Sequence, residues 1–414
     1  MKASVLVRGN RSTASPCRRT HRAGLLMVAA IIAAVSVPVQ AEDGHEAWLR
    51  YAPIQNGAAR ERLAASPAVV VRLDESPVST VAQQEMIRGI RGMLGQTLRA
   101  ETRLPDESAI VLGTYAAFEK ANPGLRPAPT LKPDGYWLKS MPIHGHPSLL
   151  VAASNDRGVL YGTFAVLRKI ALGESVTALD EREEPSAPVR WVNQWDNLDG
   201  TIERGYGGRS IFFEGGQVTE DLTRVREYGR LLASIGINGC TINNVNADSR
   251  LLTTPYVLQL ARIADAFRPW GVRLALAADL GSPKTIGGLG TFDPLEPAVA
   301  QWWKDKASEI YAAIPDFGGF LVKADSEGRL GPSVYGRMPA DAANVIARGL
   351  ESHGGIVLYR AFVYNHHLDW HNPKNDRARA AYDIFHPLDG QFDENVVVQI
   401  KNGPIDFQVR EPAS

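Results

Sequence analysis

The chain has 414 residues, in which 45 Lys and Arg balance 45 Asp and Glu. This length is enough for two domains that each bury a substantial core. The zero formal net charge gives no support for a nucleic-acid partner, because proteins that bind nucleic acid usually carry a basic surface. Hydrophobic residues make up 44% and charged residues 22% of the chain, which is typical of an ordered globular protein.

Residues 1–41 are predicted to be a secretory signal peptide. Several arginines precede an apolar run from Leu25 to Val37, and Ala41 supplies a small residue for cleavage. The apolar run is short for a membrane span, although an uncleaved anchor is the alternative. We expect a secreted or periplasmic protein with no stable membrane association after cleavage. Cys17 leaves with the signal, so Cys240 has no partner for an intramolecular disulfide.

Residues 42–180 are predicted to form a small α+β domain. Apolar runs predict strands, and a period of 3.6 residues predicts helices over 81–99 and 159–170. The segments 134–136 and 157–162 resemble the small N-terminal domain that several secreted glycoside hydrolases share, and we assign this domain no chemistry. The polar, proline-containing segment 181–188 is predicted to be a linker.

Residues 189–414 alternate short β-branched runs with helical segments, which is typical of βα units around a parallel sheet. This pattern predicts a (β/α)8 TIM barrel of which about six strands are present, since a complete barrel uses about 250 residues. We therefore expect a fragment or a truncated product. The predicted strands lie near 189–194, 239–243, 273–277, 319–323, 356–360 and 396–401.

Charged residues follow the strand predicted at 319–323. Lys323, Asp325 and Glu327 alternate along a backbone that is predicted to be extended, so all three side chains are expected to point to the same side. Charge at the C-terminal end of a barrel strand is typical of a catalytic face, and a solvated strand end is the alternative. Lys401 and Asp406 repeat the pattern after a later strand. Two carboxylates, each close behind a lysine, suggest a glycosidase that acts on an anionic sugar.

Aromatic and amide side chains follow two other predicted strands. An indole face can stack against a pyranose ring. A core position is the preferred interpretation for Trp191, and both interpretations stay open for Trp195. The run Asn243-Asn244-Val245-Asn246 offers short amides that can bond to sugar hydroxyls, with a locally bonded turn as the alternative.

Four segments together resemble the microbial α-glucuronidases, family 67 of the glycoside hydrolases. They are residues 195–200 (WDNLDG), 243–247 (NNVNA), 322–328 (VKADSEG) and 401–412 (KNGPIDFQVREP), and further matches begin near Trp48. The resemblance implies a hydrolase that releases α-1,2-linked glucuronic acid, often 4-O-methylated, from xylooligosaccharides with inversion. It implies no metal and no cofactor, glucuronoxylan-derived oligosaccharides as substrates, and a homodimer for full-length relatives.

The resemblance also implies roles for individual residues. Glu327 matches the general acid, and Asp406 matches one of two carboxylates that activate water. The second, a glutamate, and a helical C-terminal domain have no counterpart in the sequence, so we expect the chain as given to be an inactive fragment. Cationic groups around the glucuronate are matched by Lys323, Arg360 and Lys401, and apolar contacts to the sugar and its methyl ether by Trp195 and Val245.

Two other functions are compatible with parts of the sequence. A β-hexosaminidase-like hydrolase would need an adjacent Asp-Glu pair, whereas Ser326 separates Asp325 from Glu327. A secreted, non-catalytic sugar-binding protein would keep the aromatic and cationic residues without turnover. Three histidines at 366, 367 and 371 lack the intervening glutamate of a zinc protease helix, so we predict no metal site.

Overall fold

The computed structural model describes residues 49–64, 67–122, 131–326, 328–361, 369, 371–372 and 377–400. The predicted signal peptide lies outside these described residues. Within them, no helix combines the length and the apolar character that crossing a membrane requires.

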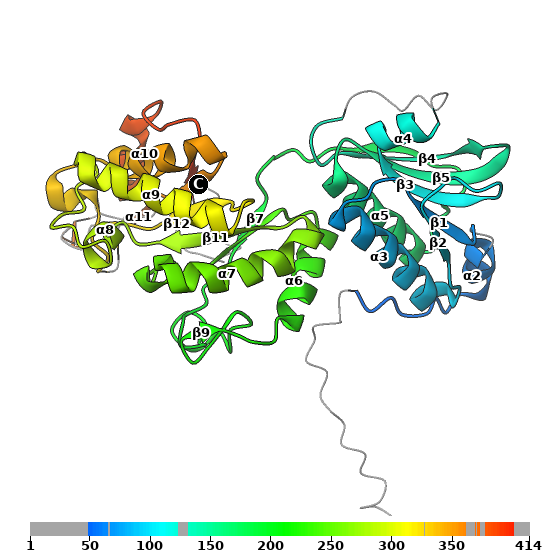
Figure 1. Cartoon of the computed structure of the whole chain (residues 1–414), viewed down its shortest axis with the longest axis horizontal. Coiled ribbons are helices and arrows are strands. Elements are labelled where there is room, and N and C mark those ends of the chain that lie inside the picture. The colour runs from blue at the N-terminus through cyan, green and yellow to red at the C-terminus, as the bar shows by residue number, and fades with distance from the viewer. Residues whose placement is uncertain are drawn as a thin grey trace, which may run out of the picture. The chain divides into compact units, whose positions relative to one another are not determined.

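The first part of the described chain forms a mixed six-stranded sheet (Figure 1). Its order is β2 (Arg99–Glu101), β1 (Val69–Arg72), β3 (Ala109–Thr114), β5 (His146–Ala153), β4 (Tyr136–Ile143) and β6 (Asp180–Glu183). Strand β4 runs antiparallel to both of its neighbours, and the other pairs are parallel. Helices α3 (Pro77–Leu94) and α5 (Asp156–Ala171) bury one face, and α4 (Tyr115–Ala121) covers the other. Helix α2 (Gly57–Ala64) precedes β1.

The helices of this sheet begin at side-chain caps. Helix α3 starts at Pro77, four residues before the predicted start, because the Ser76 side chain accepts a hydrogen bond from the backbone N–H of Ser79. It ends at Gly95, whose φ of 74° is the left-handed conformation that glycine adopts without strain. In the same way, the Asn155 side chain caps helix α5.

The predicted linker is shorter than expected. Residues Asp180–Glu183 form strand β6, which pairs with β4. Two side chains of β4 hold this strand: Trp137 Nε1 donates to Asp180 at 2.7 Å, and Lys139 Nζ donates to the same carboxylate at 2.6 Å. The polar composition of residues 180–183 favoured the prediction of a linker. An edge strand, however, needs few apolar residues, so this composition is also compatible with a strand.

The second sheet is parallel throughout, with the order β14-β13-β12-β11-β10-β7 (Figure 1). Neighbours in sequence are neighbours in the sheet, which confirms the prediction of a partial (β/α)8 barrel with six strands among the described residues. The strands are β7 (Trp191–Asn193), β10 (Gly239–Ile242), β11 (Arg273–Ala278), β12 (Gly319–Val322), β13 (Ile356–Arg360) and β14 (Val396–Gln399).

Helices connect consecutive strands of this sheet. They are α6 (Thr223–Ser234), α7 (Thr254–Phe267), α9 (Pro297–Ala313), α10 (Pro339–Leu350) and α11 (Arg377–Phe385). A small hairpin of β8 (Phe213–Glu214) and β9 (Gln217–Val218) and the single turn α8 (Ser282–Thr285) lie in the connections.

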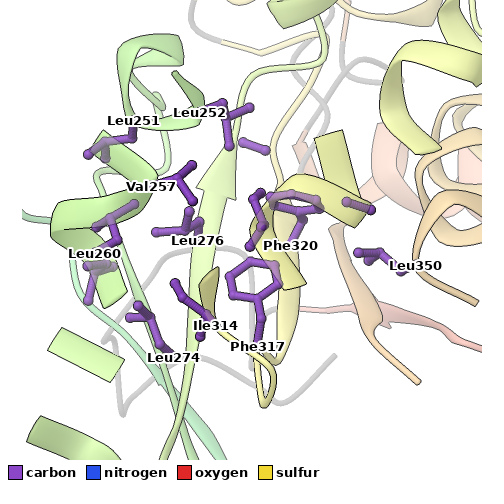
Figure 2. Packing of buried hydrophobic residues seen from close by; sticks show 14 of the residues in the cluster. Leu251, Leu252, Val257, Leu260, Leu274, Leu276, Ile314, Phe317, Phe320 and Leu350 are labelled. Carbon is purple, nitrogen blue, oxygen red and sulfur yellow. The ribbon is translucent and has the colours of Figure 1, made fainter. Parts of the chain in front are cut away.

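One face of the parallel sheet packs against these helices. Figure 2 shows Leu274 and Leu276 of β11 against Val257 and Leu260 of α7, and all four are buried. Phe320 of β12 packs edge-to-face with Phe317 and Trp303. Side chains alternate between the two faces of a strand, so the neighbours of these residues point the other way.

The opposite face of the sheet holds a smaller cluster. It consists of Val245, Ala247, Ala277, Leu321 and Leu358, with Trp191, Trp195 and Ile356 packed against it. Gly318 and Gly319 make room for it. A Cβ at Gly318 would lie 2.7 Å from the Trp191 ring, and one at Gly319, where φ is 132°, would lie 1.9 Å from the Ile356 carbonyl oxygen. Trp191 is partly buried and packs closely against Gly318, in agreement with the preferred interpretation of Trp191 as a core residue.

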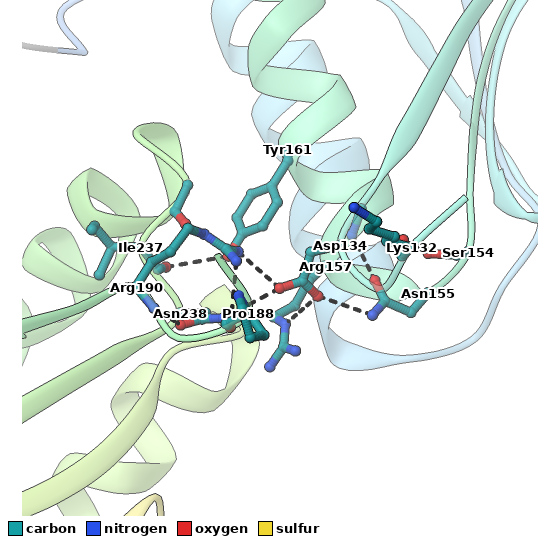
Figure 3. A network of polar contacts seen from close by, with 12 residues as sticks. Lys132, Asp134, Ser154, Asn155, Arg157, Tyr161, Pro188, Arg190, Ile237 and Asn238 are labelled. Carbon is teal, nitrogen blue, oxygen red and sulfur yellow. Dashed lines mark hydrogen bonds and ion pairs between the residues drawn. The ribbon is translucent and has the colours of Figure 1, made fainter. Parts of the chain in front are cut away.

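Buried ion pairs join the two sheets. Asp134 is 3% exposed and accepts hydrogen bonds from Arg157 Nε and Arg190 Nη2, both at 2.8 Å (Figure 3). Burial opposes ionisation of Asp134, but the two arginines and Asn155 outweigh it, so its pKa lies below the ordinary value. A second pair links Glu85 of α3 to Arg230 of α6 at 2.8 Å. These contacts hold the parallel sheet against the N-terminal sheet.

Candidate active site

Two predicted site residues stand side by side at the C-terminal ends of neighbouring strands. The last paired residues of β12 and β13 are Val322 and Tyr359. Lys323 and Arg360 are the next residues along the two strands. Their side chains therefore lie on the sheet face that holds Leu321, nearer to the C-terminal ends of the strands. They are 4% and 8% exposed, which means that two cationic side chains are buried next to each other at this edge of the sheet.

Arg360 reaches across the sheet to Trp195. The guanidinium carbon of Arg360 lies 5.6 Å from the centre of the Trp195 ring. Strands β10, β11 and β12 separate β13 from β7, so a flat sheet would put the two strands roughly 19 Å apart at about 4.8 Å per strand. The contact therefore requires the curled sheet of a barrel wall, and Trp195 lies on its inner face.

Val245 completes this group. It is 3% exposed and belongs to the same inner cluster that Trp195 packs against. The structure thus brings together four of the predicted site residues: Trp195, Val245, Lys323 and Arg360. The other three, Glu327, Lys401 and Asp406, lie outside the described residues.

The amides after β10 divide between local and longer contacts. Asn243, whose φ is 76°, donates to the Ala277 carbonyl oxygen at 3.0 Å. The Asn244 side chain accepts from the backbone N–H of Asn246 at 2.9 Å, which closes a turn. The turn interpretation therefore describes Asn244, whereas this bond of Asn243 reaches the neighbouring strand β11. The Asn246 side chain instead accepts from Lys323 Nζ at 3.0 Å.

The prediction that Lys323, Asp325 and Glu327 share one side is wrong for Asp325. Strand β12 ends at Val322, and Asp325 has a φ of 52°, so the alternation of an extended backbone stops there. The Asp325 carboxylate accepts hydrogen bonds from the hydroxyl and the backbone N–H of Ser333. It therefore anchors the loop that follows rather than facing the inner cluster.

Sequence reasoning missed Glu203. Its backbone N–H donates to the Trp195 carbonyl oxygen at 2.8 Å, and its own carbonyl accepts from Asn197 at 2.7 Å. The side chain is 11% exposed, and its Oε2 is buried without a hydrogen-bond partner among the described residues. Glu203 has a left-handed φ of 56°, which is uncommon for a residue other than glycine. This feature is visible in the structure and could not be read from the sequence.

A second buried carboxyl follows Trp195 directly. Asp196 is 1% exposed, and its Oδ2 has no hydrogen-bond partner within the described ranges. Burial raises its pKa, and a hydrogen bond with Ser210 only partly offsets this effect. Its backbone carbonyl oxygen accepts a hydrogen bond from the backbone N–H of Asn244 at 2.8 Å, which ties it to the turn after β10.

The arrangement has the chemistry of a site for an anionic sugar. Two buried cations offer charge-assisted hydrogen bonds to a carboxylate, and an indole and a valine offer apolar contact to a ring. Across the described part of the chain, no three His, Cys, Asp or Glu side chains gather closely enough to hold a metal ion.

Comparisons with known proteins agree with this chemistry. Residues 47–166 match the N-terminus of glycosyl hydrolase family 67, and residues 169–414 match the middle domain of the same family. An α-glucuronidase A from Emericella nidulans is 49% identical over 400 residues, which cover 93% of this chain and 46% of the relative. An α-glucuronidase from Hypocrea jecorina is also 49% identical, over 94% of this chain and 46% of its own length.

The chain thus spans about half the length of these curated relatives. Among solved structures, a family GH115 4-O-methyl-α-glucuronidase with specificity for decorated arabinogalactans has a TM-score of 0.50 at 17% identity. The alignment covers 81% of this chain and 45% of that protein, and at this identity it shows a shared fold alone.

Proposed function

Because the chain belongs to glycosyl hydrolase family 67, we propose that it is an α-glucuronidase. Its proposed substrates are xylooligosaccharides from glucuronoxylan that carry α-1,2-linked glucuronic acid or its 4-O-methyl ether. The observation that carries this proposal is the pair of buried cations, Lys323 and Arg360, beside Trp195 on the inner face of the sheet.

Recognition of the sugar follows from these contacts. A uronic acid differs from a neutral hexose by one carboxylate, and a buried arginine can bind a carboxylate through two parallel hydrogen bonds. Lys323 and Lys401 would add positive charge around the same group. Trp195 offers its ring to the C–H groups of the sugar, and Val245 offers an apolar surface for the methyl ether.

The proposed reaction is hydrolysis with inversion. Glu327 protonates the leaving xylosyl oxygen, and Asp406 helps to activate the water that attacks the anomeric carbon from the opposite side. This mechanism requires about 6.5–9.5 Å between the acid and base carboxyl groups, so that a water fits between them. These roles rest on the resemblance of residues 322–328 and 401–412 to the family, and the signal-like segment 1–41 supports secretion of the protein.

The test is to incubate the full chain with a 4-O-methylglucuronosyl xylotriose and to follow the products by proton NMR. The proposal predicts free uronic acid whose β anomer appears first and then equilibrates with the α anomer. Initial release of the α anomer would contradict inversion. Release that is equal for the wild type and for Glu327→Ala would contradict the role of Glu327 as the general acid of the proposed enzyme.

A further inference from the structure

Asn246 contacts the ammonium of Lys323. Lys323 extends from the end of strand β12, and its ammonium donates to Asn246 Oδ1 at 3.0 Å. The two residues are 77 positions apart in sequence, so the contact ties the connection after β10 to the end of β12. A lysine side chain has a flexible four-carbon stem, and a fixed acceptor selects one of its many conformations.

Asn246 is itself held in place. Its backbone N–H donates to Asn244 Oδ1 at 2.9 Å, and the backbone N–H of Asn244 donates to the Asp196 carbonyl oxygen at 2.8 Å. The chain of contacts therefore begins next to Trp195 and ends at the ammonium of Lys323. These contacts hold the backbone of Asn246, whose side chain carries the acceptor for Lys323.

The chemical type of this acceptor matters. An amide oxygen orients an ammonium group by a hydrogen bond but carries no charge. A carboxylate in the same place would form an ion pair at about 3 Å, and its negative charge would repel an anionic ligand through the same Coulomb interaction. Asparagine and aspartate have nearly the same shape, so a change from one to the other at position 246 mainly alters the charge.

We propose that Asn246 is a positioning residue, which fixes the ammonium of Lys323 toward the carboxylate of the sugar without itself neutralising that charge. This inference rests on the proposed function, because it takes a uronic acid as the ligand. It assigns to Asn246 the selectivity for acidic over neutral sugars, and it assigns no contact between Asn246 and the reacting atoms.

The test compares binding of sodium D-glucuronate and D-glucose to the full chain by calorimetry or ligand NMR. Asn246→Asp is expected to reduce the preference for glucuronate by about 10-fold or more, because the new carboxylate competes with the ligand. Asn246→Ala should reduce it by only about threefold, since the ammonium keeps its charge and loses one orienting bond. Asn246→Gln, which keeps a neutral amide oxygen, should stay closest to the wild type.

Asn244→Asp is the matched control, because it adds the same charge to the same turn without replacing the acceptor of Lys323. It is expected to change the preference less than Asn246→Asp does. A purely structural role for Asn246 predicts the opposite order, in which aspartate is tolerated and alanine is the more harmful change. Thermal melting of each variant shows whether it is folded, and glucose binding controls for the integrity of the site.

The outcomes separate the two proposals. If the wild type prefers glucuronate and Asn246→Asp keeps that preference, the role of Asn246 is overturned while the proposed function stands. If the wild type binds glucuronate no better than glucose, the recognition of a uronic acid by this face is overturned, and the role of Asn246 goes with it.

Discussion

Arg360 lies over the ring of Trp195, although Arg360 ends strand β13 and Trp195 follows strand β7 at the far edge of the same sheet. The ring is a neutral partner that attracts a cation through its electron-rich face. Arg360 makes this contact in a position where it is only 8% exposed. Trp195 also packs against the inner apolar cluster, so one side chain links a buried cation to the apolar face of the sheet.

Replacing Arg360 should weaken binding of acidic sugars selectively. We expect Arg360→Ala to reduce D-glucuronate binding by about 2–5 kcal/mol, because a buried charge pair with the ligand is lost. Binding of D-glucose should change far less. Arg348→Ala is the control, since Arg348 pairs with Asp393 and its side chain is 67% exposed. Equal losses for both sugars at Arg360, measured by calorimetry, would remove it from carboxylate recognition.

Val245 is predicted to set the preference for the methyl ether. Val245→Ala should lower the ratio of affinities for 4-O-methylglucuronate and glucuronate, because an apolar pocket gains about 1–3 kcal/mol per methyl-sized group. The ratio is informative even if the variant is less stable, since both sugars meet the same folded protein. An unchanged ratio in competition binding would place the methyl group elsewhere.

Much of the fold follows from local patterns. The glycine-led strand Gly319–Val322 lies near its predicted position, because a buried parallel strand needs continuous apolar residues. The β-branched run Val396–Gln399 also forms a strand near its predicted position, although it is only partly buried at the edge of the sheet. The placement of Lys323 and Arg360 at one edge also follows, since all parallel strands present their C-terminal ends together.

Other features depend on contacts that the sequence does not encode locally. Strand β6 is polar and exists through hydrogen bonds from Trp137 and Lys139. The left-handed backbone at Asp325 is supported by Ser333, eight residues later. Glu203 lies beside Trp195 because the segment between them folds back on itself. Each of these features depends on specific contacts between side chains or backbone groups, which the spacing of apolar residues along the sequence does not predict.

The contact between the two sheets should depend on Asp134. Asp134→Ala leaves Arg157 and Arg190 without their shared carboxylate, and we expect the free energy of unfolding to fall by about 3–5 kcal/mol. Asp383→Ala, which breaks an exposed pair with Arg379, should cost far less, because water screens the pair. Urea unfolding of the three proteins measures both values.

This contribution should also depend on pH. Because the folded-state pKa of Asp134 lies below its ordinary value of 3.8, its stabilisation is present above that value and is lost as the pH falls through the lowered pKa. The difference between wild type and Asp134→Ala should therefore shrink in acid. A difference that stays constant down to the acid transition would contradict the role of the ion pairs.

Asp196 should have the opposite effect. Burial raises its folded-state pKa, so the ionised carboxyl destabilises the fold increasingly as the pH rises from its ordinary value of 3.8 toward the raised pKa. Asp196→Asn should accordingly gain stability relative to the wild type between acid and neutral pH. A flat difference for Asp196→Asn would show that its carboxyl does not carry this cost.

The most direct test of the account is a crystal structure of the full chain with 4-O-methyl-D-glucuronic acid. The account predicts that the carboxylate lies within hydrogen-bond distance of both Arg360 and Lys323, with the sugar ring against Trp195 and the methyl ether against Val245. A sugar bound away from the inner face of the parallel sheet, or bound there with its carboxylate directed to solvent, would contradict it.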